Sequence, residues 1–161
     1  MATDKYDAID EGGIAAAVYI SLIADEAVTL WSPVIMVTNT GITNGLPRVE
    51  PINTANSPGV IGIAVGGTGP VESGTAASAA GKTVQVQIYG LCKVRVDGNV
   101  ANIAIGDNLI TDTTDGVARK VTDYPATYGS SDIARHVFAK AMQASTVDLD
   151  IIACFLTGGS Q

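Results

Sequence analysis

The clearest alternation of hydrophobic and polar positions lies in residues 84–96, with the sequence VQVQIYGLCKVRV. Every even position is apolar or small, while the odd positions include two glutamines, a lysine and an arginine. A period of two places alternate side chains on opposite faces of an extended strand. Thirteen residues would span about 43 Å, more than most strands do, and Gly90 on the inward face permits a sharp bend. The stretch therefore predicts two strands joined at a corner in an all-β domain.

The same alternation recurs along the chain. Residues 14–24 share it, although three alanines leave a helix open as an alternative. Short apolar runs between turn residues predict further strands at 27–38 with a break at Ser32-Pro33, 46–50, 60–65, 108–111, 117–121, 137–142 and 147–156. In the expected final hairpin, Val147, Leu149 and Ile151 should face the core, and Asp148 and Asp150 should face water. The small-residue stretch 66–82 is expected to be a mobile surface loop.

Two halves of the chain follow a similar plan. Residues 18–22 match 92–96, and the remaining matches keep the same order along the chain, namely 32–38 with 106–111, 45–49 with 116–121, 60–65 with 137–142, and 83–90 with 146–153. The identities are few, so chance similarity among β-rich segments remains an alternative. A true duplication predicts one closed or nearly closed sheet in which strand 84–96 ends the first unit and opens the second. Closure would remove open edges that invite aggregation. We therefore expect a compact β-barrel or β-tulip-like domain with an internal duplication.

Composition sets the size of this domain. The chain has 161 residues, of which 47% are hydrophobic and 16% charged, enough to bury one core. We expect a flexible N-terminal arm at 1–13, a domain at 14–157 and a tail at 158–161. The net charge of −7 argues against nucleic acid as a partner. No membrane association is expected, because the longest apolar run, 14–24, is too short to span a bilayer. The start of the chain does not resemble a signal peptide, so synthesis in a cytoplasm is expected.

Candidate chemistry is sparse. His136 is the only histidine and lies near Ser130, Ser131 and Asp132, but neighbours in one loop need not converge as a catalytic triad must. Cys92 and Cys154 lie in strand-like runs and are expected to be buried free thiols, with a disulfide as the alternative. Turn residues at 111–115 lack the spacing of a calcium loop. Gly81-Lys82-Thr83 precedes a strand, whereas a phosphate-binding loop precedes a helix. We expect no enzyme activity, metal or cofactor.

The chain resembles the tailed-phage capsid cement, or head decoration, proteins. The resemblance covers roughly residues 27–156 and rests on the VIGIAV strand, the VQVQIYG strand that ends in glycine, and the turn Gly106-Asp107-Asn108-Leu109. It implies an all-β homotrimer on the outer capsid surface of the virion. There it would bind neighbouring major capsid proteins and stabilise their contacts, and the protein would be made in the host bacterial cytoplasm. The long loop at 66–82 departs from the family pattern.

The resemblance also gives the N-terminal arm a function. Such an arm often adds β-structure to a capsid-protein sheet, whose edge strands carry unpaired N–H and C=O groups. Tyr6 and Ile9 are the large apolar groups of residues 1–13, and we predict that Tyr6, Ile9 and Asp10 bind the partner. Two alternatives remain. One is a glycan-binding β-module displayed on a particle surface, which would need exposed aromatic rings although Trp31 is expected to be buried. The weaker one is a small hydrolase that uses His136.

Overall fold

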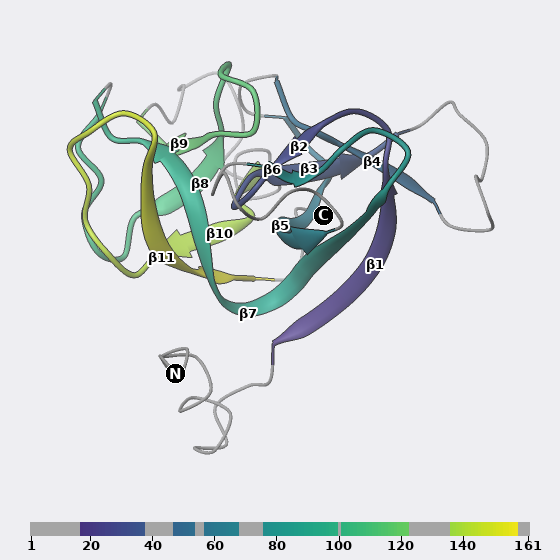
Figure 1. Cartoon of the computed structure of the whole chain (residues 1–161). Helices are drawn as coiled ribbons and strands as arrows, with labels where there is room; N and C mark the ends of the chain where they lie inside the picture. The colour runs from purple at the N-terminus through teal and green to yellow at the C-terminus, as the bar shows by residue number, and fades with distance from the viewer. Residues whose placement is uncertain are drawn as a thin grey trace, which may run out of the picture.

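The structure, a computed structural model, describes residues 17–37, 47–53, 57–67, 76–99, 101–122 and 136–157. Every named element within these ranges is a β-strand, as the alternating pattern predicts (Figure 1). In chain order the strands are β1 (Val18–Ala24), β2 (Val28–Thr29), β3 (Pro33–Met36), β4 (Arg48–Pro51), β5 (Val60–Gly67), β6 (Ala76–Ser78), β7 (Thr83–Asp97), β8 (Asn108–Thr111), β9 (Ala118–Lys120), β10 (Ala139–Ala141) and β11 (Asp150–Leu156).

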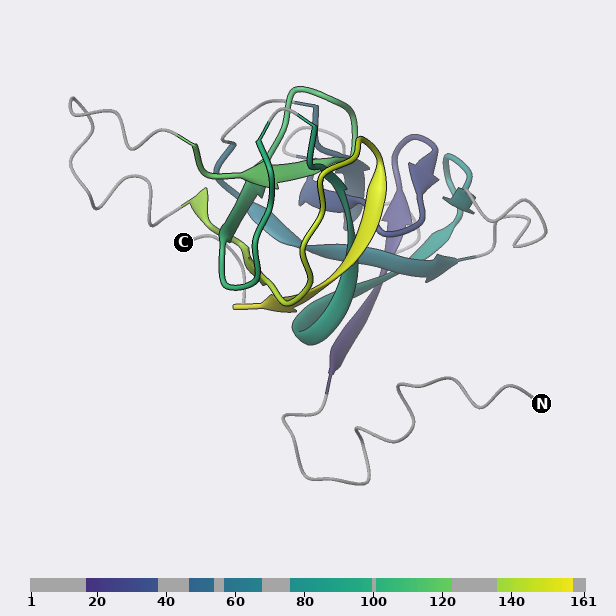
Figure 2. The ribbon, with the colours of Figure 1, turned by 90° about the vertical axis from the view of Figure 1, so that its left-hand side faces the viewer.

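Nine of these strands form two closed rings. The first ring runs β1-β4-β3-β5-β7 and closes because β7 also pairs with β1. The second ring runs β7-β11-β10-β8-β9 and closes because β9 also pairs with β7. Figure 1 shows the first ring on the right and the second on the left, and Figure 2 shows the second ring from its own side, with β11 lying along β7. The prediction of an all-β barrel fold is confirmed.

Strand β7 belongs to both rings and turns between them at Gly90. Residues up to Tyr89 pair with β1 and β5, whereas residues from Gly90 onward pair with β11. Gly90 has a φ of 96°, a backbone conformation that glycine adopts far more easily than other residues. The predicted corner is therefore confirmed. The ladder continues through it, however, so residues 83–97 form one bent strand rather than two.

The two rings have the same connectivity, as the internal repeat predicts. In the first ring β1 runs parallel to β4, and in the second the C-terminal half of β7 runs parallel to β9. The other pairings within each ring are antiparallel and join corresponding strands. The match of residues 83–90 with 146–153 is out of register, since β11 begins only at Asp150. A few identical residues in a run of alternating apolar and polar positions are not enough to fix how two such segments align.

Each ring encloses its own set of buried aliphatic side chains. The first contains Leu22, Val34, Val49, Val84 and Val86 among others. The second is larger and includes Val94, Leu109, Phe138, Ile152 and Leu156. Ile63 of β5 packs with the second set although β5 belongs to the first ring, so the rings share a buried contact. This contact makes the two rings one packed unit within the described residues.

Two sequence expectations are wrong in detail. Part of the small-residue stretch 66–82 forms β6, which pairs with β2, and Ala77 is only 3% exposed. A short alanine side chain can fill a narrow gap at the end of a ring, so small residues do not exclude a buried strand.

The second error concerns the last hairpin. Strands β10 and β11 do pair, but Val147, Leu149 and Ile151 are 57%, 49% and 40% exposed. Residues 147–149 precede the strand, and the pairing of Cys154 with Cys92 turns the even positions of β11 into the core. The odd positions therefore face outward. When both faces of a strand are apolar, alternation alone does not show which face is buried.

Several predicted features lie outside the described residues. They are the arm at 1–13 and the tail at 158–161. The domain limits at 14 and 157 therefore stay a prediction.

Candidate functional site

The residues expected to bind a partner, Tyr6, Ile9 and Asp10, lie outside the described residues. The same holds for Ser130, Ser131 and Asp132, so the structure does not place them relative to His136, which is half-buried. Among the residues that the structure describes, no three His, Cys, Asp or Glu side chains gather as a metal site would require. The described part of the chain contains no candidate for a membrane-spanning helix.

The two cysteines form a buried cross-strand pair without a disulfide. Cys92 of β7 lies directly opposite Cys154 of β11, and both thiols are free. Burial raises the pKa of Cys92 to about 12, and burial together with the neighbouring thiol raises the pKa of Cys154. Neither thiol is therefore ionised near neutral pH, which makes both of them core residues rather than nucleophiles. The prediction of buried free thiols is confirmed.

One exposed apolar surface lies on the second ring. Hydrogen bonds from Gly106 N to Ala141 O and from Met142 N to Ala153 O, both 2.8 Å long, hold its segments side by side. Ile105 is 71% exposed at one end of this surface, which we call the second-ring surface and define by Ile105, Met142, Val147, Leu149 and Ile151. Several exposed apolar side chains on one ring make it a candidate protein-binding site.

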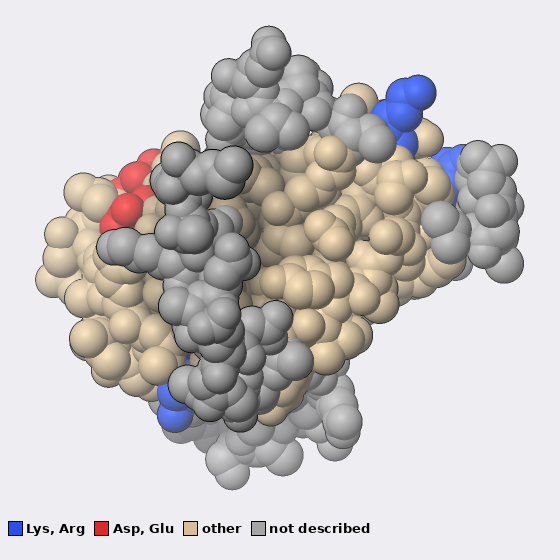
Figure 3. All heavy atoms as spheres, turned by 60° about the horizontal axis from the view of Figure 1, so that its bottom comes forward, with Lys and Arg blue, Asp and Glu red and all other residues tan. Residues whose placement is uncertain are grey.

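A second exposed group of side chains lies beside the β7 bend. Val18 and Tyr19 of β1 and Tyr89 of β7 are 44%, 49% and 37% exposed, and the ring of Tyr89 packs edge-on against Phe155 with centroids 5.6 Å apart. On the face that contains the bend, the visible described side chains are mostly uncharged, with Lys, Arg, Asp and Glu near the margins (Figure 3). This face can therefore bind an uncharged surface with little desolvation of charge.

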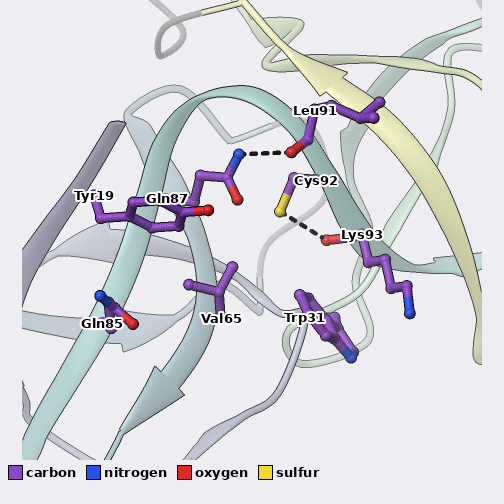
Figure 4. A pocket seen from close by; sticks show the side chains of 8 residues that line it. All are labelled: Tyr19, Trp31, Val65, Gln85, Gln87, Leu91, Cys92 and Lys93. Atoms are coloured by element: carbon purple, nitrogen blue, oxygen red, sulfur yellow. Dashed lines mark hydrogen bonds between the residues drawn. The ribbon is translucent and has the colours of Figure 1, made fainter. Parts of the chain in front are cut away.

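A pocket of about 220 Å³ lies on the concave side of the bend. Figure 4 shows Tyr19 on one side of it and Trp31 on the other, with Val65 of β5 between them. The remaining lining residues all come from β7, namely Gln85, Gln87, Leu91, Cys92 and Lys93. The pocket thus combines two aromatic rings, two amides and one ammonium group. Gln85, Gln87 and Lys93 come from the two halves of β7, so the bend in this strand brings them to one pocket.

Trp31 is held in an uncommon backbone conformation at this pocket. Its φ is 67°, a region that bulky residues rarely occupy. The Trp31 N–H donates to Ala64 O at 2.8 Å, and the Trp31 carbonyl accepts from Arg95 N–H at 2.9 Å. The Lys93 Nζ atom lies 5.5 Å from the centroid of the indole ring, within cation–π range. These contacts fix the Trp31 indole relative to both closed sets of strands.

The buried side chain of Gln87 forms hydrogen bonds across the bend. It is 3% exposed, and its amide nitrogen donates to Tyr89 O at 3.1 Å and to Leu91 O at 2.8 Å, the two carbonyls that flank Gly90. Figure 4 shows the hydrogen bond to Leu91. Alternation assigns Gln87 to the polar face of the strand, and sequence analysis missed its structural role. The sequence did contain an indication of this role, because a glutamine three residues before a glycine bend can donate hydrogen bonds to backbone carbonyls that lose their strand partners at the bend.

Ionic contacts lie at the outer ends of the strands. Asp25 accepts a 2.6 Å hydrogen bond from Arg48, and Asp107 accepts from Lys120 at 2.9 Å. Burial acts to raise the pKa of Asp107, but the Ala104 N–H and Lys120 outweigh it and the pKa is lowered. Burial raises the pKa of Glu26, and the negative charges of Asp115, Glu50 and Asp25 raise it further. None of these groups lines the pocket.

Comparison with known proteins yields one informative similarity. No family model matches the sequence, and no curated protein matches it either. Among solved structures, the chain is similar to the N base of the head fiber gp8.5 of bacteriophage phi29, with a TM-score of 0.56 and 17% sequence identity. The match covers 91% of this chain and 98% of that chain. At this identity the likeness shows a shared fold.

Proposed function

We propose that this protein is a structural component of a tailed-phage virion that binds the outer surface of the capsid. The observation that carries the proposal is the fold shared with a phage head fiber base over 91% of the chain. In finer detail, we propose a homotrimer that stabilises contacts between major capsid proteins, as a cement or decoration protein does. Under this proposal the protein is not an enzyme, and it is made in the host bacterial cytoplasm before it joins the virion.

The second-ring surface supports this role. Its members, of which Ile105 and Val147 are the most exposed, lie in β11 or in turns next to the strands of the second ring. Docking would remove their apolar surface from water, which favours binding. We propose that this surface contacts the major capsid protein. The arm with Tyr6, Ile9 and Asp10 would add further contacts, and three copies in a trimer would bind together with increased avidity.

The test is co-sedimentation of the protein with expanded, empty phage heads, with its oligomeric state measured by light scattering. We expect saturable binding and a mass three times the chain mass of 16.4 kDa. Deletion of residues 1–13 should leave a folded trimer that binds heads weakly. Failure of the wild-type protein to sediment with heads would overturn the proposal, and a monomeric mass would overturn the trimer.

Substitutions can locate the contact. Leu149→Asn removes an exposed apolar group and suits the φ of 54° at that position, because asparagine tolerates this region. Combined with Met142→Ser, it should weaken head binding about tenfold without lowering the melting temperature. Val18→Ser, an exposed apolar change beside the bend, is the matched control and should bind like the wild type. Equal loss in both variants would contradict the second-ring surface as the contact.

A further inference from the structure

The pocket on the concave side of the β7 bend has a feature that attachment to a phage head does not require. Residues held in sparsely populated backbone regions cost free energy and cluster at ligand-binding sites, where their fixed position is part of the function. Trp31, with a φ of 67° and backbone hydrogen bonds to Ala64 and Arg95, is such a residue. It bounds the pocket, so its fixed position determines the shape of one wall.

Lys93 packs against this wall and does not supply a charge to the space inside it. Its Nζ atom lies 5.5 Å from the centroid of the indole ring, and Figure 4 shows it on the side of Trp31 that faces away from Tyr19. The other described residues that line the pocket are uncharged. The space between Tyr19 and Trp31 therefore suits a neutral ligand, because an ion would lose its hydration there without gaining a partner of opposite charge.

The polar groups that face this space are two amides. The side chain of Gln87 is held in place, because its nitrogen donates to Tyr89 O and Leu91 O, and its oxygen faces the pocket in Figure 4. Gln85 is exposed at the rim and can adjust to a ligand. Amides offer both donors and acceptors, and a hydroxyl group also donates and accepts. The two amides are therefore matched to a ligand that carries several hydroxyls.

The walls and the size of the pocket favour a single ring. Tyr19 and Trp31 lie on opposite sides, with Val65 between them (Figure 4). Aromatic and aliphatic walls suit C–H groups, and a pyranose ring combines a C–H face with hydroxyls around its edge. Sites for drug-sized molecules measure about 300–1,000 Å³, so a volume of about 220 Å³ holds something smaller.

One sequence expectation had argued against sugar binding. Trp31 was expected to be buried, which would leave no aromatic surface for a sugar ring. That expectation is wrong, because Trp31 is only partly buried and bounds the pocket.

We propose that this pocket binds one neutral hexopyranose unit of a glycan. The C–H face of the sugar ring packs against Trp31, while Gln85 and the amide oxygen of Gln87 form hydrogen bonds with its hydroxyls. A proline-rich peptide also binds aromatic walls, but it needs a groove that accommodates several residues, whereas this pocket holds one ring. For one monosaccharide, a typical ligand efficiency gives a dissociation constant of about 1 mM. Many copies on one particle would increase the strength of binding, and this last step rests on the proposed function.

The experiment uses Trp31 as its own reporter, because it is the only tryptophan in the chain. The full-length protein is titrated with methyl β-D-glucopyranoside and with methyl β-D-galactopyranoside, each up to about 50 mM, while tryptophan fluorescence is followed. We expect a saturable change with at least one glycoside, and the tighter of the two shows which orientation of the hydroxyl at carbon 4 the amides accept. N-acetyl-L-prolinamide represents the peptide alternative and should bind at least about fivefold more weakly.

Variants then assign the contacts. Gln85→Ala should weaken glycoside binding about fivefold, because it removes hydrogen bonds to a hydroxyl. Tyr19→Ser, which removes one aromatic wall, should weaken it by about the same factor. Gln143→Ala, an exposed amide on the second ring, is the matched control and should bind like the wild type. Saturation-transfer NMR detects the bound sugar independently of fluorescence.

Three results would overturn the proposal. The first is that neither glycoside shows saturable binding by either method. The second is that N-acetyl-L-prolinamide binds as tightly as the better glycoside, and the third is that Gln143→Ala weakens glycoside binding as much as Gln85→Ala does. Head co-sedimentation is measured without sugar, so its outcome is separate.

Discussion

The backbone N–H of Arg95 donates a 2.9 Å hydrogen bond to the carbonyl oxygen of Trp31, joining a turn of the first ring to the second half of β7. The N–H of the same tryptophan donates to Ala64 in β5. One residue thus connects the two rings at the point where β7 passes between them. The relative position of the rings, and with it the pocket, depends on the geometry of the bend. The first two predictions test that geometry.

The bend should tolerate only glycine at its corner. Gly90→Ala places a side chain on a residue with a φ of 96°, so we expect the free energy of unfolding to fall by about 1–2 kcal/mol. Chemical denaturation measures this change. Gly66→Ala is the matched control, because a methyl group there would meet only the Gln85 side chain at 3.6 Å, an ordinary contact. Equal effects at both positions would contradict a special role for the corner.

The two hydrogen bonds donated by the Gln87 side-chain amide should also stabilise the fold. Gln87→Leu keeps the side chain near its original size but removes the donor to Tyr89 O and Leu91 O, and we expect a loss of about 1–3 kcal/mol. Gln85→Leu, two positions earlier and exposed, should change the unfolding free energy by less than about 0.5 kcal/mol. A Gln87 variant as stable as the wild type would show that water replaces the amide.

Sequence analysis predicted the strand-based architecture but not these supporting contacts. Alternation from Val84 to Val96 and the glycine at position 90 predicted a bent strand shared by two units, because both features are local. The role of Gln87 and the orientation of Ile151 depend on pairing with distant strands. Period two cannot supply that information when both faces of a strand are apolar or when a polar residue turns inward. The pocket was missed for the same reason, since Tyr19, Trp31 and Lys93 meet only after β7 bends.

The stability of the fold should depend on pH through Asp107. Its folded-state pKa is lowered from the ordinary value of an aspartate, so its carboxylate stabilises the fold above about pH 4, and this contribution is lost as the pH falls through the lowered pKa. Asp107→Asn should therefore flatten the decline of melting temperature in acid. Glu26, with a raised pKa, has the opposite sign, so Glu26→Gln should increase stability at neutral pH. Melting curves from pH 2.5 to 7 check both signs, and a parallel shift of both variants would contradict them.

The cysteine pair should be chemically inert in the folded protein. Cys92 and Cys154 are at most 2% exposed, and their raised pKa values leave almost no thiolate at pH 8. Thiol-specific labelling of the native protein should therefore proceed only at the rate of unfolding, whereas two thiols should react immediately in denaturant. Rapid labelling of either cysteine under native conditions would show that the second ring opens locally.

The central claim, attachment to the outside of a phage head, is tested most directly by electron cryomicroscopy of expanded heads incubated with the purified protein. We expect additional density on the outer face, in groups of three copies, into which the two-ring fold fits with the second-ring surface toward the capsid. Heads with no added density at saturating protein concentration, under conditions in which the protein is folded, would contradict the account.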